Sequence, residues 1–195
     1  QMANEIVFKA TIRFLAANPE GFPAVTSTGR LASVMNNNLN YGGHLSAQPF
    51  GALFNYVDGD AVNFPLHEKN PYRLDNDKML SLVDEHRPPL VVFGKSMFLH
   101  PEPVTLVADH VREMSPRPLI MFDMAHVLGL YGAFQTPLEE GADLVTGSTH
   151  KTFFGPQRGL IAGKVGKGSA WQGIWSDVKS RAFPGSTSNH HLGTL

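Results

Sequence analysis

Residues 118–123 read PLIMFD, a short apolar run that ends on an aspartate. Continuous apolar runs of this length are typical of strands that are buried on both faces of a parallel sheet. LVVFG at 90–94 and ADLVTGST at 142–149 repeat the pattern on either side of it in the chain. Each of the three runs is therefore predicted to be one strand of a buried sheet.

Segments with helical spacing of apolar residues separate these runs. A mostly apolar face within 1–17 predicts a first helix, and Asp75 is a suitable cap for another. Helices are predicted from about 75 to 85, 103 to 114 and 125 to 131, with a short helix within 45–57. Residues 169–183 could form either a helix or a loop. Further strands are predicted at 31–36, 61–66 and 158–164. Alternating strands and helices predict parallel strands joined by right-handed crossovers, hence an α/β fold with three layers, α/β/α, and a mostly parallel sheet.

The composition excludes several classes of function. Sixteen Lys and Arg against seventeen Asp and Glu give a net charge of -1, whereas nucleic-acid surfaces need concentrated basic residues. The absence of cysteine excludes disulfides and thiolate metal sites and fits a reducing compartment. No apolar stretch has the length of a membrane span, and no signal-peptide pattern opens the chain. We therefore expect a cytoplasmic protein without a nucleic-acid or membrane partner.

Chemistry-bearing residues follow the predicted strands. Lys151 stands at the end of the strand in DLVTGSTHKTFFGPQRG, residues 143–159, where burial without a partner would lower its pKa and make it an amine nucleophile. Because ligands of such sheets bind beyond the carboxyl ends of the strands, Ser96, Asp123 and Lys151 should gather on one rim. Taken alone, Asp123 could equally cap the next helix, and His126 could be an ordinary core or surface histidine. Together, the lysine, carboxylate and histidine are what a pyridoxal phosphate site needs.

Other candidates favour a structural interpretation. The adjacent His190 and His191 have no partner at helical i,i+4 spacing, so a zinc site is not expected. Lys95 is expected to be a solvated lysine rather than an anion contact. The first helix begins without a cap and the chain stops at NHHLGTL, residues 189–195, so we expect an internal piece of a longer protein.

Three segments together resemble the serine hydroxymethyltransferase family. They are NLNYGGHLS at 38–46, FDMAHVLGLYG at 122–132 and ADLVTGSTHKTFFGPQRG at 142–159. Their order and spacing match the family, so the resemblance covers most of the chain, from about Gln1 to Leu195. It implies the fold-type I large domain of a pyridoxal 5'-phosphate enzyme, of which residues 1–195 would be the central part. An N-terminal segment, a C-terminal small domain and a homodimeric or higher partner would complete it.

The resemblance also implies residue roles. Lys151 would be the Schiff-base lysine, Asp123 the partner of the pyridine nitrogen, His126 a hydrogen-bond partner of the phenolic oxygen, and His44 the residue stacked on the ring. Further positions matching cofactor contacts are Ser96, Ser148, Thr149, His150, Ser188 and Asn189, and positions matching contacts to the pteridine of tetrahydrofolate are Leu39, Gly42 and Gly43.

Some residues depart from the family pattern. GPQRG at 155–159 replaces Gly-Pro-Arg-Gly-Gly, Ala47 replaces a histidine, and Ser188-Asn189 replaces paired glycines. The Gln157 turn and the Ser-Asn segment look more like L-threonine transaldolases.

The family implies an amino-acid substrate whose Cα–Cβ bond is cleaved or formed through a glycine carbanion, interconverting serine and glycine with tetrahydrofolate. An L-threonine aldolase or transaldolase on the same scaffold is the alternative. A non-catalytic binding relative is a third hypothesis, opposed by retention of Asp123, His126, Lys151 and His44.

Overall fold

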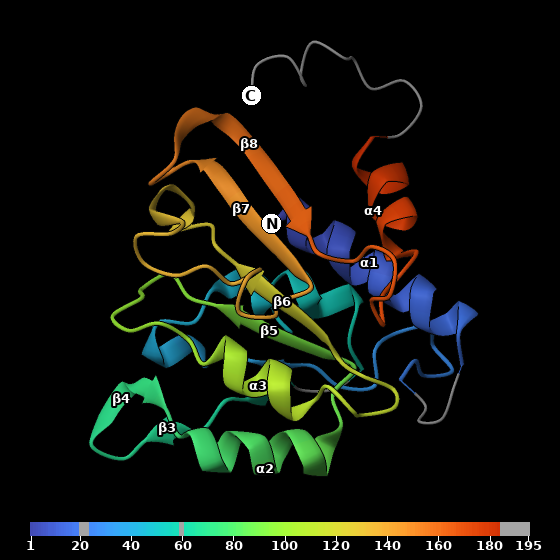
Figure 1. The fold of residues 1–195 in the computed structure, drawn as a ribbon, viewed down its shortest axis with the longest axis horizontal. Helices are drawn as coiled ribbons and strands as arrows, with labels where there is room; N and C mark the ends of the chain where they lie inside the picture. Colours follow the sequence, from blue (N-terminus) through green and yellow to red (C-terminus); the bar gives the residue numbers. More distant parts are fainter. Residues whose placement is uncertain (20–23, 59–60, 184–195) are drawn as a thin grey trace.

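The computed structural model describes residues 1–19, 24–58 and 61–183, and its centre is a six-stranded sheet (Figure 1). The strand order is β2-β1-β5-β6-β7-β8. The strands are β1 (Met35–Asn36), β2 (Val62–Asn63), β5 (Leu90–Gly94), β6 (Leu119–Asp123), β7 (Leu144–His150) and β8 (Phe154–Gly163). All neighbours are parallel except β7 and β8, which are antiparallel. A separate hairpin joins β3 (Leu66–His67) to β4 (Asn70–Leu74).

Helices cover both faces of this sheet (Figure 1). α1 (Met2–Ala17) and α4 (Ile174–Ala182) pack on one face, and α2 (Asn76–His86) and α3 (Val104–His110) pack on the other. The mostly parallel, three-layer α/β/α fold expected from the sequence is therefore confirmed. Among the described residues no helix has the length and apolar content needed to cross a bilayer.

The sheet is buried on both faces because successive side chains of its central strands enter two different cores. Val92 and Met121 pack with α1 and α4, whereas Phe93 and Phe122 pack with α2 and α3. Strand geometry sends alternate side chains to opposite faces, so a strand between two helical layers needs apolar residues at every position. Every residue of β5 and β6 is buried, as their continuous apolar runs predict.

Several predicted elements are shorter than the sequence suggested. The strand expected at 31–36 pairs in the sheet only at Met35–Asn36, and the helix expected to reach 114 ends at His110. The predicted helix at 125–131 is only a 3-10 turn at Leu128–Leu130. Its backbone is held elsewhere, because the Met124 amide donates to the carbonyl of Thr146 in β7 at 2.7 Å. The segment 45–57 likewise forms two 3-10 turns, Leu45–Ala47 and Ala52–Asn55, while 169–183 does contain the helix α4.

An ion pair joins the chain segments that lead into β6 and β7, at the end of the sheet where these two strands begin. Arg117 Nη1 lies 2.9 and 2.8 Å from the two carboxylate oxygens of Asp143. The same carboxylate accepts a 2.8 Å hydrogen bond from the Ile120 amide. One buried side chain thus sets where the two strands start relative to each other.

We predict that Asp143→Asn lowers the free energy of unfolding by about 1.5–3 kcal/mol, because hydrogen bonds to a charged group contribute about that much. Urea denaturation of the full-length protein measures the loss. Asp109→Asn, which removes an exposed carboxylate paired with Arg112 on the surface, is the matched control and should change stability by less than about 0.5 kcal/mol. Equal losses in the two variants would contradict the role assigned to Asp143.

Candidate active site

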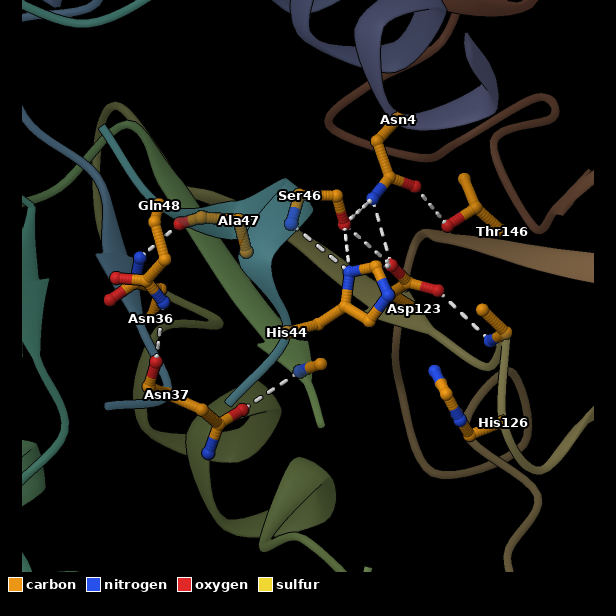
Figure 2. Close-up of polar contacts among 12 residues, drawn as sticks. Asn4, Asn36, Asn37, His44, Ser46, Ala47, Gln48, Asp123, His126 and Thr146 are labelled. Atoms are coloured by element: carbon orange, nitrogen blue, oxygen red, sulfur yellow. Dashed lines mark hydrogen bonds and ion pairs between the residues drawn. The ribbon is translucent and has the colours of Figure 1, made fainter. Parts of the chain in front are cut away.

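Four candidate side chains meet at the carboxyl edge of the parallel strands. Lys151, directly after β7, places its Nζ 3.0 Å from His126 Nε2. The His126 ring lies 5.4 Å, centroid to centroid, from the ring of His44, and His44 Nδ1 lies 3.8 Å from Oδ2 of Asp123. Lys151, His126, His44 and Asp123 therefore form one continuous group. Figure 2 shows three of them, His126, His44 and Asp123.

Asp123 is the buried centre of this group, with 3% of its surface exposed. Its Oδ2 accepts hydrogen bonds from Asn4 Nδ2 at 2.8 Å and Ser46 Oγ at 3.2 Å, and its Oδ1 accepts one from the Ala125 amide at 2.9 Å. A carboxylate has about four acceptor sites, so these bonds leave capacity for a further donor. The bond to Ala125 resembles the cap that the sequence left open, but it holds a turn rather than a regular helix.

Asn4 connects α1 to the site and was not anticipated from the sequence. Besides its bond to Asp123, Asn4 Nδ2 lies 2.8 Å from Ser46 Oγ, and its Oδ1 accepts a 2.6 Å bond from Thr146 Oγ1 of β7 (Figure 2). Asn4 lies on the buried face of α1, with Val7 and other apolar side chains. A buried polar side chain needs partners, so the polar residue on this apolar face is the signal that could have identified Asn4.

His44 is positioned by a loop whose backbone runs close to its neighbours. The His44 amide donates to the Gly94 carbonyl at 3.0 Å. Gly42 has φ +92°, which favours glycine, and a Cβ at Gly43 would lie 2.5 Å from the Asn37 carbonyl oxygen. Glycine is therefore needed at both positions for the backbone conformation that places His44 at the rim.

His126 is held by β7 and by the connection that follows it. It follows the Met124 amide bonded to β7, and its carbonyl accepts a 3.1 Å bond from Thr152 Oγ1 in the β7–β8 connection. The imidazole is half-buried beside Lys151. Its position thus depends on the same connection that carries the lysine.

Burial lowers the pKa of both site histidines below their ordinary value of 6.5. For His126, the positive charge of Lys151 and then the neighbouring His44 lower the pKa further, against an opposing effect of Asp123. For His44, Asp123 raises the pKa and Lys151 lowers it, but desolvation is the largest cause. Both imidazoles are therefore neutral at pH 7 and can each present one donor and one acceptor nitrogen.

The remaining candidates differ in their exposure and in their contacts. Ser96 is exposed, and its amide donates to the Gly42 carbonyl at 2.7 Å. Ser148 is half-buried and His150 is exposed at the end of β7, while the buried Thr149 donates from its hydroxyl to the Pro156 carbonyl at 2.5 Å. Leu39 is exposed in a 3-10 turn before the two glycines, and Ser188 and Asn189 lie outside the described residues.

The expectation for Lys95 is wrong. Instead of being solvated, Lys95 is buried, with its Nζ 2.5 Å from Glu102 Oε1. The sequence interpretation failed because Glu102 lies beyond a proline-containing loop, where no local pattern indicates that the two side chains meet.

Comparison with known proteins identifies the relatives of this chain. The family model described as serine hydroxymethyltransferase matches residues 16–191. Serine hydroxymethyltransferases of Thermoplasma acidophilum and Methanosphaera stadtmanae are 38% and 41% identical over 181 and 180 residues, covering 92% and 91% of this chain. The chain spans 40% of the length of each of these curated relatives.

A solved structure is also similar. It is L-threonine transaldolase from Pseudomonas fluorescens in its internal aldimine state, with a TM-score of 0.67, 24% sequence identity, and coverage of 95% of this chain and 39% of the other. At this identity the likeness shows a common fold.

We predict that Lys151→Met raises the pKa of His126, and to a smaller extent that of His44, because the variant removes a neighbouring positive charge. Histidine titration by NMR in the full-length protein without cofactor measures the shifts. Lys167→Met, an exposed lysine beyond the far end of β8, is the control and should leave both pKa values unchanged.

The same pKa shifts predict how stability depends on pH. Because both histidines have folded-state pKa values below 6.5, the unfolded chain binds protons first as the pH falls. The contribution of the two neutral histidines to the stability of the folded state is fully present above pH 6.5. It is lost as the pH drops through the folded-state pKa values. Urea denaturation at pH 7 and pH 5 should show a smaller loss of stability for His44→Gln than for the unaltered protein; an equal loss would contradict the assignment.

Proposed function

The chain belongs to the serine hydroxymethyltransferase family, and from this premise we propose that the full-length protein is a pyridoxal 5'-phosphate enzyme that interconverts serine and glycine. Its reaction cleaves or forms the Cα–Cβ bond of a β-hydroxy amino acid, with tetrahydrofolate as the one-carbon acceptor. The observation that carries the proposal is the convergence of Lys151, His126, His44 and Asp123 at one rim of the sheet.

The chemistry of these four side chains fits the proposed cofactor. A lysine amine can hold its aldehyde covalently, a buried carboxylate can pair with its pyridine nitrogen, and neutral imidazoles can pack on a ring or hydrogen-bond an oxygen. We assign these roles to Lys151, Asp123, His44 and His126 respectively. When bound, pyridoxal phosphate supplies a protonated pyridine ring that withdraws electrons from Cα of the substrate.

The protein's own contribution would be to keep this ring protonated and oriented. A negative charge near the nitrogen favours the protonated state, and the bonds from Asn4, Ser46 and Ala125 fix the Asp123 carboxylate that provides it. His126, neutral at pH 7, would place one ring nitrogen toward the phenolic oxygen. Ser96, Ser148, Thr149 and His150 surround this group in the proposal.

We further propose that residues 1–195 are the central part of the cofactor-binding domain. Segments beyond this chain would supply further groups for the cofactor phosphate and the substrate carboxylate, and a second subunit would complete each site. Ser188 and Asn189 are assigned to the phosphate, and Leu39, Gly42 and Gly43 to the pteridine. The proposed protein is a cytoplasmic homo-oligomer acting on small amino acids.

The first test measures glycine formation by the full-length protein loaded with pyridoxal phosphate, from serine and from threonine, each with and without tetrahydrofolate. We expect glycine from serine that depends on folate. Folate-independent acetaldehyde from threonine would assign the protein to the aldolases and transaldolases instead. No turnover, together with no borohydride trapping of cofactor on Lys151, would support a non-catalytic relative; Lys151→Met is the control for the trapping.

We also predict unequal effects of two substitutions. Asp123→Asn should lower kcat/KM by about a hundredfold or more, because it removes the charge that keeps the ring nitrogen protonated. His44→Ala should lower kcat/KM by about tenfold at most, since a ring-packing contact contributes about 0.5–1.5 kcal/mol. Steady-state kinetics with serine compare the two, and a larger loss in His44→Ala would contradict the roles.

A further inference from the structure

The buried ion pair between Lys95 and Glu102 has no part in the function proposed so far. The two residues are 3% and 4% exposed, and Lys95 Nζ also donates to the Tyr72 carbonyl at 3.3 Å. Removing two charges from water is costly, and buried pairs can often be replaced by apolar residues without loss of stability. Stability alone is therefore a weak reason for this pair.

The pair is connected to the end of β5 through Asn37. Asn37 Nδ2 donates to Glu102 Oε2 at 2.9 Å, while Asn37 Oδ1 accepts a 2.8 Å bond from the Gly94 amide. The backbone of Glu102 is itself fixed, because its amide and carbonyl each bond to the side chain of Gln135 at 3.0 and 2.7 Å. We name this group of three residues, Lys95, Glu102 and Asn37, the polar lock. Because the backbone of Glu102 is fixed, the lock fixes the position of the Gly94 backbone through Asn37.

Gly94 in turn contacts both His44 and Asp123. Its carbonyl accepts the His44 amide, and a Cβ added to Gly94 would lie 3.0 Å from Asp123 Cβ. The next residue, Lys95, pairs with Gly43 through the backbone. The position of the histidine relative to the carboxylate therefore depends on where the lock places this backbone.

Hydrogen bonds between residues 36–37 and residues 47–48 join the two ends of the loop that carries His44. Gln48 Nε2 donates to the Asn37 carbonyl at 2.9 Å, and Asn36 Nδ2 donates to the Ala47 carbonyl. Figure 2 shows these amide side chains on one side of the loop and His44, facing Asp123, on the other. Asn37 is therefore common to the lock, the end of β5 and the closure of the loop.

We propose that the polar lock of Lys95, Glu102 and Asn37 positions His44 and Ser46 against Asp123 and thereby orients the cofactor ring. The inference rests on the proposed function for its link to the cofactor. Among the described residues, the side-chain bonds of the lock end on the backbone of Gly94 and Tyr72 and on each other. These three are therefore positioning residues, which act through His44 and Ser46.

The test compares three variants of the full-length protein. Glu102→Gln removes one charge of the lock, and Lys95→Met with Glu102→Leu replaces the whole pair by apolar side chains that fill similar volume. Asp143→Asn is the matched control, because it breaks a buried ion pair with Arg117 at the opposite edge of the same sheet. If Glu102→Gln does not fold, the double variant carries the test, since apolar replacement of a buried pair often leaves stability unchanged.

Two readouts separate positioning from stability. Hydrogen–deuterium exchange of the segment 37–48, measured without cofactor, reports whether the His44 amide keeps its bond to Gly94. Visible circular dichroism of bound pyridoxal phosphate and the separate kcat and KM values for serine report ring orientation.

We expect both lock variants to show faster exchange in 37–48 and to lose most of the visible dichroism. We also expect them to lower kcat by about 3- to 10-fold with little change in KM, because displacing the His44 ring should cost no more than removing it. In the control variant Asp143→Asn, the exchange rate of 37–48, the visible dichroism and kcat should stay within about twofold of the unaltered protein, while unfolding occurs at a lower urea concentration. The proposal is overturned if the double variant matches the unaltered protein, or if Asp143→Asn changes the loop and the dichroism equally.

These outcomes also separate the inference from the proposed function. A full-length protein that binds no pyridoxal phosphate would contradict the function, whereas exchange in 37–48 would still decide whether the lock holds the loop. Normal exchange in both lock variants would refute the inference even if the enzyme is active.

Discussion

A buried carboxylate must be hydrogen-bonded, and at Asp123 this requirement joins segments that are far apart in the chain. Its donors come from α1, from the loop after β1 and from the turn after β6. Loss of one of these donors would leave the buried charge less fully compensated in a medium of low polarity. The arrangement of the first helix and of the histidine loop around the sheet edge is thus coupled to the satisfaction of one charged group.

The parallel sheet makes this possible because its strands end together. β6 and β7 are neighbours in register, so Asp123 lies opposite Thr146 and the chain after β7 returns over the same edge with Lys151. The antiparallel β8 then extends the sheet beyond the lysine rather than crossing the rim. Two apolar cores fix the strands from both faces, while the rim keeps the polar groups that the cores exclude.

Sequence patterns were sufficient for elements whose cause is local. The unbroken apolar runs of β5 and β6 and the capped helix after Asp75 follow from residues within a few positions of one another, and the structure contains them. The motifs around Asp123 and Lys151 likewise pointed to one rim. Elements set by distant contacts were predicted less well, as in the region after Asp123, whose backbone bonds to β7 rather than to itself.

The same distinction separates the predicted part of the site from the rest. Asn4 and Asp123 are 119 positions apart, and no local spacing indicates that their side chains meet. Lys95 was misread because its burial depends on Glu102 and on the carbonyl of Tyr72, which come from different segments. Polar groups that satisfy one another across the fold are visible only once the fold is known.

The doubly closed loop between Asn37 and Gln48 has a consequence for how this scaffold can diversify. Its base and its histidine-bearing arm are fixed by side-chain amides and by glycine backbone contacts, whereas its tip at Leu39–Tyr41 is an exposed 3-10 turn without buried residues. Changes in the tip alter the surface beside the rim without moving the imidazole. The loop therefore divides into a frame fixed by its contacts and an exposed tip, and laboratory libraries meant to change the surface beside the rim should randomise only the tip.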